Sequence, residues 1–418
     1  MATLFTCNIT DTVNLSENLS DSPFTINWLL QSLLSSDDTF KAIAESSAIT
    51  KVETLFISEG KGYVSKVYKV SIYFNNSDES YDVILKVPGV ESFNEDPSNT
   101  AGNEILTLDF VFRAHNLECD FYNNYAPCVD IPLVKVYKAI ELKDGVTTGA
   151  LLMESMVRKA DSLSISDSAT KDQAFTVAKH LASLYKHFLC LPQEQWVGKY
   201  KTNALTSLLK ENVYGPIFDK FLTTYPGVFD EALKVFRPYV CNDQFYEYMM
   251  TNVYKDSGLP PVLTHGDTWA NNLMWKKNLD GSLSNELIAL LDWQIIHEGS
   301  NTNDIARFMT LCLDGDVRRE CEYEVLQYLF DRIVELMKEA GRTVDFTFEQ
   351  MTKAYQANLI GQALHLWSML GFIFSGEGWT DEEKPLKMAQ RDKVFQRTRL
   401  AVEDALKYFK DIPKDRFE

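Results

Sequence analysis

The chain has 418 residues, of which 45% are hydrophobic and 24% charged, and a formal net charge of −18. Its length exceeds one ordinary hydrophobic core, so we expect two domains. The strong negative charge argues against nucleic acid or an anionic membrane as a partner. No apolar run reaches the roughly 20 residues needed to cross a bilayer, so we expect no membrane span.

Cysteine usage favours a reducing compartment. The seven cysteines are scattered without a Cys-x-x-Cys pair, which argues against a zinc site or a disulfide framework. The N-terminus lacks the basic and apolar regions of a signal peptide, so a cytoplasmic location is expected. Residues 1–22 are rich in Asn, Ser, Thr and Asp, and this composition predicts a loosely ordered arm.

The next part of the chain changes from helical to strand periodicity. Residues 25–44 place apolar side chains at helical spacing. An alternating pattern then predicts three strands, over residues 52–57, 63–74 and 81–87. The turn after the first strand carries Gly60, Gly62 and Ser65. Its backbone amides either cover phosphate groups or belong to an ordinary hairpin turn.

Lys86 lies at the end of the third strand, as either a phosphate-binding lysine or an edge-blocking one. A phosphate-binding lysine needs a glutamate partner from the next helix, which we predict over residues 100–116. Glu104 in this helix and Glu118 just after it are both candidates. Two more strands, over residues 131–137 and 149–156, complete a five-stranded first lobe.

The rest of the chain is mainly helical in pattern. Amphipathic spacing predicts helices over residues 171–191, 319–340, 348–374 and 382–409, with an aromatic-rich helical insertion over residues 195–257. The predicted fold class is therefore α+β. A five-stranded antiparallel N-terminal lobe would span residues 1–155, and a mainly helical C-terminal lobe residues 156–418.

One stretch carries three polar groups suited to chemistry. Residues 262–274 begin as a short buried strand and then present Asp267 and Asn272 on one loop. A second apolar run, over residues 287–291, delivers Asp292 at its end. An Asp that takes a proton from a hydroxyl, with an Asn and a second Asp near one metal ion, is what phosphoryl transfer from Mg-ATP requires.

This stretch also resembles a known catalytic loop. His265-Gly-Asp267-x-x-x-x-Asn272 is similar to the His-x-Asp-x-x-x-x-Asn loop of protein kinases and of aminoglycoside and choline kinases. The form Thr-His-Gly-Asp-x-Trp-x-Asn-Asn-Leu-Met most resembles the ecdysteroid-kinase-like group, also called CHK kinase-like proteins. Gly266 stands where phosphorylation-activated protein kinases carry Arg, which favours a small-molecule kinase. By motif, the resemblance covers roughly residues 50–310.

The resemblance implies a protein-kinase-like two-lobed fold and a role for each residue of the loop. Asp267 would orient and deprotonate the acceptor hydroxyl, and His265 would fix the loop. Asn272 and Asp292 would bind Mg²⁺. Asp304, at the head of the next helix, would brace the loop by hydrogen bonds, with a plain helix cap as the alternative.

The resemblance also implies how ATP would be held. Lys86 would bind the α- and β-phosphates. Glu118 is favoured over Glu104 as its partner, because Glu118-x-x-Phe121-Tyr122 resembles a signature of the group. The backbone at the end of the fifth strand would hydrogen-bond adenine. The implied nucleotide-binding set is Gly60, Gly62, Ser65, Lys86, Glu118, Glu154 and Met156.

The expected activity is transfer of the γ-phosphate of ATP to a hydroxyl of a small acceptor, such as a sterol, a glucoside or another alcohol. Several tryptophans could stack on such an acceptor, although a core position is the commoner role. A catalytically inactive kinase-fold binding protein and a choline- or ethanolamine-type kinase are the alternatives. A protein kinase is disfavoured by Gly266, by Asp-Trp-Gln in place of Asp-Phe-Gly, and by the lack of an Ala-Pro-Glu segment.

Overall fold

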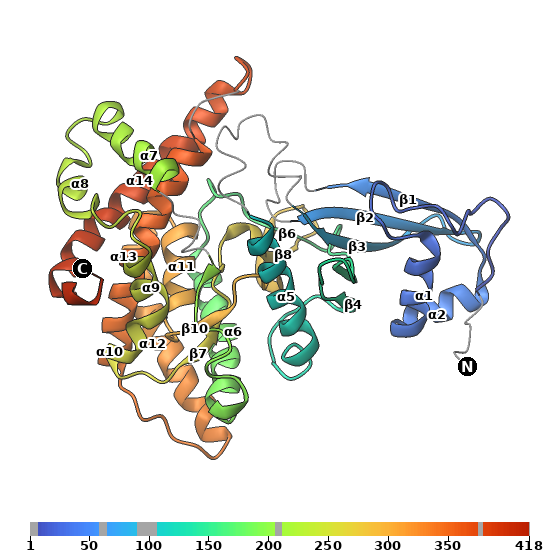
Figure 1. The fold of residues 1–418 in the computed structure, drawn as a ribbon, viewed down its shortest axis with the longest axis horizontal. Coiled ribbons are helices and arrows are strands. Elements are labelled where there is room, and N and C mark those ends of the chain that lie inside the picture. The colour runs from blue at the N-terminus through green and yellow to red at the C-terminus, as the bar shows by residue number, and fades with distance from the viewer. Residues whose placement is uncertain (1–6, 58–64, 90–106, 205–210, 375–378, 418) are drawn as a thin grey trace. The chain divides into compact units, whose positions relative to one another are not determined.

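The computed structural model describes residues 7–57, 65–89, 107–204, 211–374 and 379–417. The chain forms two compact units (Figure 1). The first comprises Met1–Pro127 and Val134–Val157, and the second Cys128–Leu133 and Arg158–Glu418. The predicted α+β class is confirmed, because the first unit contains a five-stranded antiparallel sheet and the second is mainly helical. No helix in these described ranges has the length and apolarity of a membrane span.

The first unit is built on a sheet with the strand order β1-β2-β3-β5-β4. Helices α1 and α2 pack on one face of the sheet, and their apolar side chains form one core with those of the strands (Figure 1). The elements are α1 Ile26–Ser36, α2 Asp38–Ser46, β1 Ile49–Phe56, β2 Ser65–Phe74, β3 Tyr81–Pro88, α5 Leu108–Asn124, β4 Val136–Ile140 and β5 Ala150–Glu154.

One predicted strand begins later than its apolar pattern suggests. The strand expected over residues 131–137 is β4, Val136–Ile140. Residues 128–133 belong to the second unit, where the carbonyl of Pro132 accepts a hydrogen bond from the amide of Leu290 at 3.0 Å. Proline has no N–H to donate to a strand ladder. The hydrogen-bond partner of Pro132, Leu290, lies outside the five-stranded sheet. The apolar run therefore divides between the two units.

The single helix predicted over residues 25–44 is two helices, which meet at Asp37. The backbone N–H of Asp37 donates to the carbonyl of Leu33 and ends α1. The Asp37 side chain accepts from the amide of Thr39 and caps the start of α2. Asp is a strong N-cap, because its carboxylate satisfies an amide that the helix leaves open. This capping function, rather than the apolar spacing, decided the break.

The predicted loosely ordered N-terminal arm is wrong for residues 7–22, the part of it that the structure describes. Leu19 is 1% exposed and belongs to the core of the first unit. The carboxylate of Asp21 accepts hydrogen bonds from Lys66 at 2.7 Å and from Tyr68 at 2.5 Å, both on β2. A polar composition is typical of disorder only when nothing anchors the segment. Here one apolar anchor and one paired carboxylate hold it.

The second unit consists of long helices, a two-stranded antiparallel sheet and a three-stranded sheet with the order β6-β8-β9. Strand β7 pairs with β10, and β8 pairs with β9. Its elements are β6 Ala160–Asp161, α6 Lys171–Cys190, α7 Glu211–Thr224, α8 Asp230–Phe236, α9 Asp243–Glu247, a π-helical turn Tyr248–Asn252, α10 Val253–Ser257, β7 Val262–Thr264, β8 Leu273–Lys277, β9 Leu283–Leu290, β10 His297–Gly299, α11 Asn303–Cys312, α12 Gly315–Glu339, α13 Phe348–Ile373 and α14 Lys384–Tyr408.

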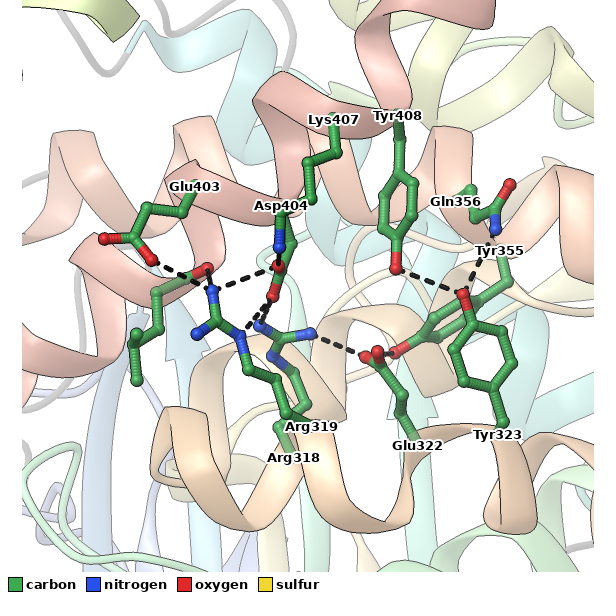
Figure 2. A network of polar contacts seen from close by, with 11 residues as sticks. Arg318, Arg319, Glu322, Tyr323, Tyr355, Gln356, Glu403, Asp404, Lys407 and Tyr408 are labelled. Carbon is green, nitrogen blue, oxygen red and sulfur yellow. Dashed lines mark hydrogen bonds and ion pairs between the residues drawn. The ribbon is translucent and has the colours of Figure 1, made fainter.

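A buried ion network joins the three long helices α12, α13 and α14 (Figure 2). Arg318 on α12 is 1% exposed and binds Glu322 at 2.6 Å and Asp404 at 2.5 Å. The hydroxyl of Tyr355, on α13, donates to Glu322 at 3.0 Å. Asp404, on α14, also accepts from Arg319 at 2.8 Å. The charges compensate one another, which is the condition for burying them.

Acid should weaken this network in a defined pH range. Burial favours a higher pKa for Asp404, but the hydrogen bonds from Arg319, Lys407 and Arg318 outweigh it and lower the pKa of this carboxyl from its ordinary value of 3.8 to about 2. A carboxyl whose pKa is lowered on folding stabilises the protein above its unfolded pKa. That contribution, about 2 kcal/mol, is lost as the pH falls from about 5 to about 2.

The measurement is urea unfolding of the protein and of Asp404→Asn at a series of pH values. The stability gap between the two should narrow by about 2 kcal/mol over that range. Asp392→Asn, an exposed position on the same helix, is the control and should follow the unmodified protein. A gap that stays constant with pH would contradict the prediction.

Candidate active site

The loop after β7 turns at a position that only glycine can occupy. Gly266 has φ +83°, in the left-handed region. A Cβ on this residue would lie 2.6 Å from the carbonyl oxygen of Ile295 and 2.9 Å from Nδ1 of His297. Both the backbone conformation and the space therefore exclude a side chain. This geometry is the physical reason that no arginine stands here.

Replacing Gly266 by alanine should cost about 3 kcal/mol of unfolding free energy. Gly281, in the β8–β9 turn, is the matched control, because its φ is +86° and nothing lies within 4 Å of a built Cβ. Gly281→Ala should cost only the left-handed conformation, about 1 kcal/mol. Denaturant unfolding of both variants measures the difference. Equal losses would show that the Ile295 carbonyl moves away without cost.

Asp304, in the first turn of α11, holds the loop by accepting hydrogen bonds from its backbone amides. Its Oδ2 accepts from the amide of His265 at 2.9 Å, and its Oδ1 from the amide of Gly266 at 2.8 Å. The Tyr185 hydroxyl on α6 also donates to Oδ2, at 2.9 Å. Asp304 is fully buried, and burial raises the pKa of its carboxyl. The side chain bonds the loop, as the resemblance implied, and does not cap its own helix, whose N-cap is Thr302.

Asp267 has each of its carboxylate oxygens held by a different residue. Oδ1 lies 2.5 Å from Nη2 of Arg307, and Oδ2 accepts from Nδ2 of Asn272 at 2.9 Å. The side chain is 20% exposed, whereas that of Arg307 is 3% exposed. Burial raises the pKa of Asp267, although the charge of Arg307 opposes it. The result is an oriented carboxylate that keeps an open side.

His265 is held as a neutral ring with both nitrogens engaged. Its Nδ1 accepts from the amide of Asp267 at 3.1 Å, so its Nε2 is the donor to the carbonyl of Leu291 at 2.9 Å. The ring packs edge-on against Trp293, with centroids 4.4 Å apart. Burial lowers the pKa of His265. A ring with this bonding fixes the loop and offers no free nitrogen as a base.

A backbone hydrogen bond brings the chain segment that carries Asp292 next to Asn272. The amide of Leu291 donates to the carbonyl of Asn272 at 2.8 Å, and the next residue, Asp292, turns with φ +69°. Both hydrogen bonds recorded for the Asn272 side chain use its amide nitrogen, so the amide oxygen is the atom suited to a cation. Within the described ranges, no three His, Cys, Asp or Glu side chains gather into a metal-binding group. Two oxygen donors plus nucleotide phosphates fit Mg²⁺, which is rarely bound by an all-protein cage.

The first unit contains the predicted lysine–glutamate pair. Nζ of Lys86 lies 2.7 Å from Oε2 of Glu118, and their side chains are 11% and 1% exposed. Lys86 is fixed in the middle of the sheet, opposite Val67 on β2 and Leu151 on β5. The structure thus shows Lys86 in contact with Glu118, the glutamate favoured by the resemblance, which lies inside α5. Glu104 lies outside the described residues.

The other predicted nucleotide-binding residues are placed in part. Gly60 and Gly62 lie outside the described residues. Ser65 is buried at the start of β2. Glu154 ends β5, and its Oε1 accepts from the amide of Lys135 at 2.7 Å. Met156 follows it and is buried. Their contribution to nucleotide binding stays a prediction.

One feature of the site, the contact from Arg307, escaped the sequence reasoning. Arg307 follows Asp304 by one helical turn, a spacing that puts both residues on one helix face. That spacing was the available signal for a second loop contact from α11. The tryptophans proposed as stacking surfaces are mixed in placement. Trp293 and Trp367 are fully buried and belong to the core, while Trp269 is half-buried.

These features define the class of the protein. A five-stranded antiparallel sheet with a buried lysine–glutamate pair, and a helical unit with the His-Gly-Asp loop, make up the protein-kinase-like fold. The family model DUF1679, described as "Uncharacterized oxidoreductase dhs-27", matches residues 39–412. The chain belongs to this family.

Two relatives from Caenorhabditis elegans align with the chain over 359 residues each. "Uncharacterized oxidoreductase dhs-27" is 27% identical and is matched over 82% of this chain and 41% of its own length. The chain thus spans about two fifths of that relative. "Uncharacterized kinase-like protein D1044.1" is 19% identical, with 83% of this chain and 90% of that protein covered.

Solved structures with a similar chain path include two phosphotransferases. A putative aminoglycoside phosphotransferase from Ralstonia eutropha JMP134 has 13% identity and a TM-score of 0.43, covering 85% of this chain and 92% of its own. A microcompartment-associated aminopropanol kinase has 12% identity and a TM-score of 0.43, covering 94% and 99%.

Proposed function

We propose that the protein is a Mg-ATP-dependent kinase of a small hydroxylated molecule, of the ecdysteroid-kinase-like type. The observation that carries the proposal is the oriented carboxylate of Asp267, held by Asn272 and Arg307 on a loop that also places Asp292 beside Asn272. The pairing of Lys86 with Glu118 in the other unit supports it, because a lysine fixed by a carboxylate is suited to nucleotide phosphates.

In this reaction Asp267 accepts a hydrogen bond from the acceptor hydroxyl and takes its proton as the oxygen bonds to the γ-phosphorus. The bond from that phosphorus to the β–γ bridging oxygen breaks, and ADP leaves. The Asn272 amide oxygen and the Asp292 carboxylate would hold Mg²⁺, which neutralises charge on the phosphates when bound. Lys86 binds the α- and β-phosphates. His265 and Asp304 keep the loop rigid, so Asp267 is positioned before the substrate arrives.

The charge around Asp267 supports a neutral acceptor, namely a sterol, a glucoside or another alcohol. Arg307 already compensates the carboxylate at 2.5 Å. An ammonium acceptor would gain little attraction from a carboxylate that is already paired and would be repelled by the guanidinium. This counts against the choline- or ethanolamine-type alternative.

All seven cysteines are free thiols, which supports a reducing, cytoplasmic location.

An oxidoreductase activity, as in the name of the first relative, is not part of the proposal. That name belongs to a protein of which the aligned segment makes up 41%. The sequence here lacks the Gly-x-Gly-x-x-Gly fingerprint of dinucleotide-binding turns. The side chains gathered around Asp267 suit phosphoryl transfer.

Calorimetry with Mg-ATP, followed by ATP turnover against a panel of hydroxylated compounds, tests the proposal. The panel should include sterols, glucosides, simple alcohols, choline, ethanolamine and a protein substrate. We expect binding, and turnover with a neutral alcohol. Binding without turnover on any compound would favour the inactive binding protein. Phosphate on choline or on the protein substrate would select those alternatives, and absence of Mg-ATP binding would overturn the proposal.

Replacing Lys86 by methionine should weaken Mg-ATP binding by about tenfold or more, because a charge-assisted phosphate contact is lost. Lys138→Met is the matched control, since Lys138 is an exposed lysine on β4 of the same sheet. Calorimetry on both variants gives the comparison. Equal affinity in the two variants would remove Lys86 from the nucleotide site.

A further inference from the structure

Arg307 links the Asp267 carboxylate to a second long helix. It lies on α11 and is almost fully buried. Its Nη2 contacts Asp267 at 2.5 Å, and its Nη1 donates to Oε1 of Gln362, on α13, at 3.0 Å. One nitrogen of the guanidinium is therefore bound to a core helix, while the other contacts the carboxylate.

Gln362 is itself held by a chain of contacts that continues through Asn303 to His297. Its Nε2 donates to Oδ1 of Asn303 at 3.3 Å, and Nδ2 of Asn303 donates to Nε2 of His297 at 3.4 Å. Nδ1 of His297 donates to the carbonyl of Ile295 at 2.9 Å. Burial lowers the pKa of His297 to about 4, and its Nε2 also lies 3.4 Å from the carbonyl oxygen of Met250. Each amide is used at both ends, which sets its orientation.

We propose that Arg307 is a positioning residue of the phosphoryl transfer, and that Gln362, Asn303 and His297 hold Arg307 so that Asp267 stays aimed at the acceptor hydroxyl. The inference rests on the proposed kinase function. Asn272 restrains only one carboxylate oxygen, so the other could still rotate away. A second restraint, from a guanidinium that cannot itself move, removes that freedom before the acceptor binds.

A purely structural ion pair would behave differently. Exchanging both partners of a buried pair for apolar side chains often leaves stability unchanged, whereas removing one partner destabilises the fold. If the pair were purely structural, removing one partner would lower the amount of folded protein and leave the turnover per folded molecule intact. A positioning role predicts the opposite pattern, in which kcat falls while the affinity for nucleotide is retained.

The test compares Arg307→Ala, Gln362→Met and the control Gln356→Met. Gln356 lies on the same helix and bonds only the Tyr323 hydroxyl among the recorded contacts. With the best acceptor from the panel, kcat should fall about 100-fold in Arg307→Ala and about tenfold in Gln362→Met. KM for ATP and calorimetric Kd for Mg-ATP should stay within about twofold in both. Gln356→Met should match the unmodified protein.

Chemical rescue and a double-mutant cycle measured by Tm complete the design. Millimolar guanidinium chloride should restore part of kcat in Arg307→Ala, and equal sodium chloride should not. In a double-variant cycle of Arg307→Met with Asp267→Ala, each of which removes the contact, the Tm shifts should be non-additive. Unchanged kcat in Arg307→Ala and Gln362→Met, or additive Tm shifts, would overturn the inference. Failure of the kinase proposal is distinguishable, because it would appear in the unmodified protein as absence of turnover.

Discussion

Asp267→Asn should lower phosphoryl transfer by about a thousandfold while the fold and Mg-ATP binding are kept. Asparagine has the same shape, and its side-chain oxygen can still accept from Arg307, which lies 2.5 Å from Oδ1 in the unmodified protein. It cannot take a proton at neutral pH, so the acceptor oxygen loses its base. The affected step is the transfer and not the binding of ATP.

Turnover of the acceptor and calorimetric binding of Mg-ATP, measured on the same sample, give the result. Asp280→Asn is the control, because Asp280 is an exposed carboxylate in the turn between β8 and β9. It should leave both quantities unchanged. Near-normal turnover in Asp267→Asn would remove Asp267 from the chemistry, and the assignment of the loop would have to be abandoned.

Asp304→Ala should cost about 3 to 5 kcal/mol of unfolding free energy and abolish turnover. The change leaves the amides of His265 and Gly266 and the hydroxyl of Tyr185 without their buried acceptor. Unpaired buried donors lose the hydrogen bonds that they would make with water, and the loop would move to recover them. Asp267 would then lose its fixed position.

Tyr185→Phe is the graded control for this prediction, because it removes one of the donors to Asp304 and leaves the loop amides bonded. It should cost about 1 kcal/mol, the value of a single hydrogen bond. Denaturant unfolding and turnover should be measured on both variants. A similar, small loss in the two would mean that the loop does not depend on Asp304.

Most elements of the fold follow from local sequence patterns. Strand β3 and helix α6 lie within one residue of their predicted bounds, because apolar periodicity and a capping box at Thr170 are both local signals. The errors arise where a capping side chain or a distant partner decides. Asp37 divides one apolar pattern into two helices, and Leu19 and Asp21 anchor a segment whose composition indicates disorder.

The site shows the same division. The loop from His265 to Asn272 was predictable, because its spacing is itself the motif. The preference for Glu118 depended on a signature beyond the predicted helix, and the structure shows how Glu118 comes to contact Lys86. Helix α5 continues to Asn124, so Glu118 lies on it and reaches Lys86. A helix ending at residue 116 would have left Glu118 in a loop.

By itself, the sequence determined the α+β class and the His-Gly-Asp loop motif, because these depend on neighbours within a few positions. Only the tertiary structure decided that Arg307 grips Asp267 across 40 positions, and that Gln362 holds Arg307 across another 55. Hydrogen bonds between distant segments leave no periodic trace in a single sequence. They exist only after burial has forced polar groups to find partners in one another.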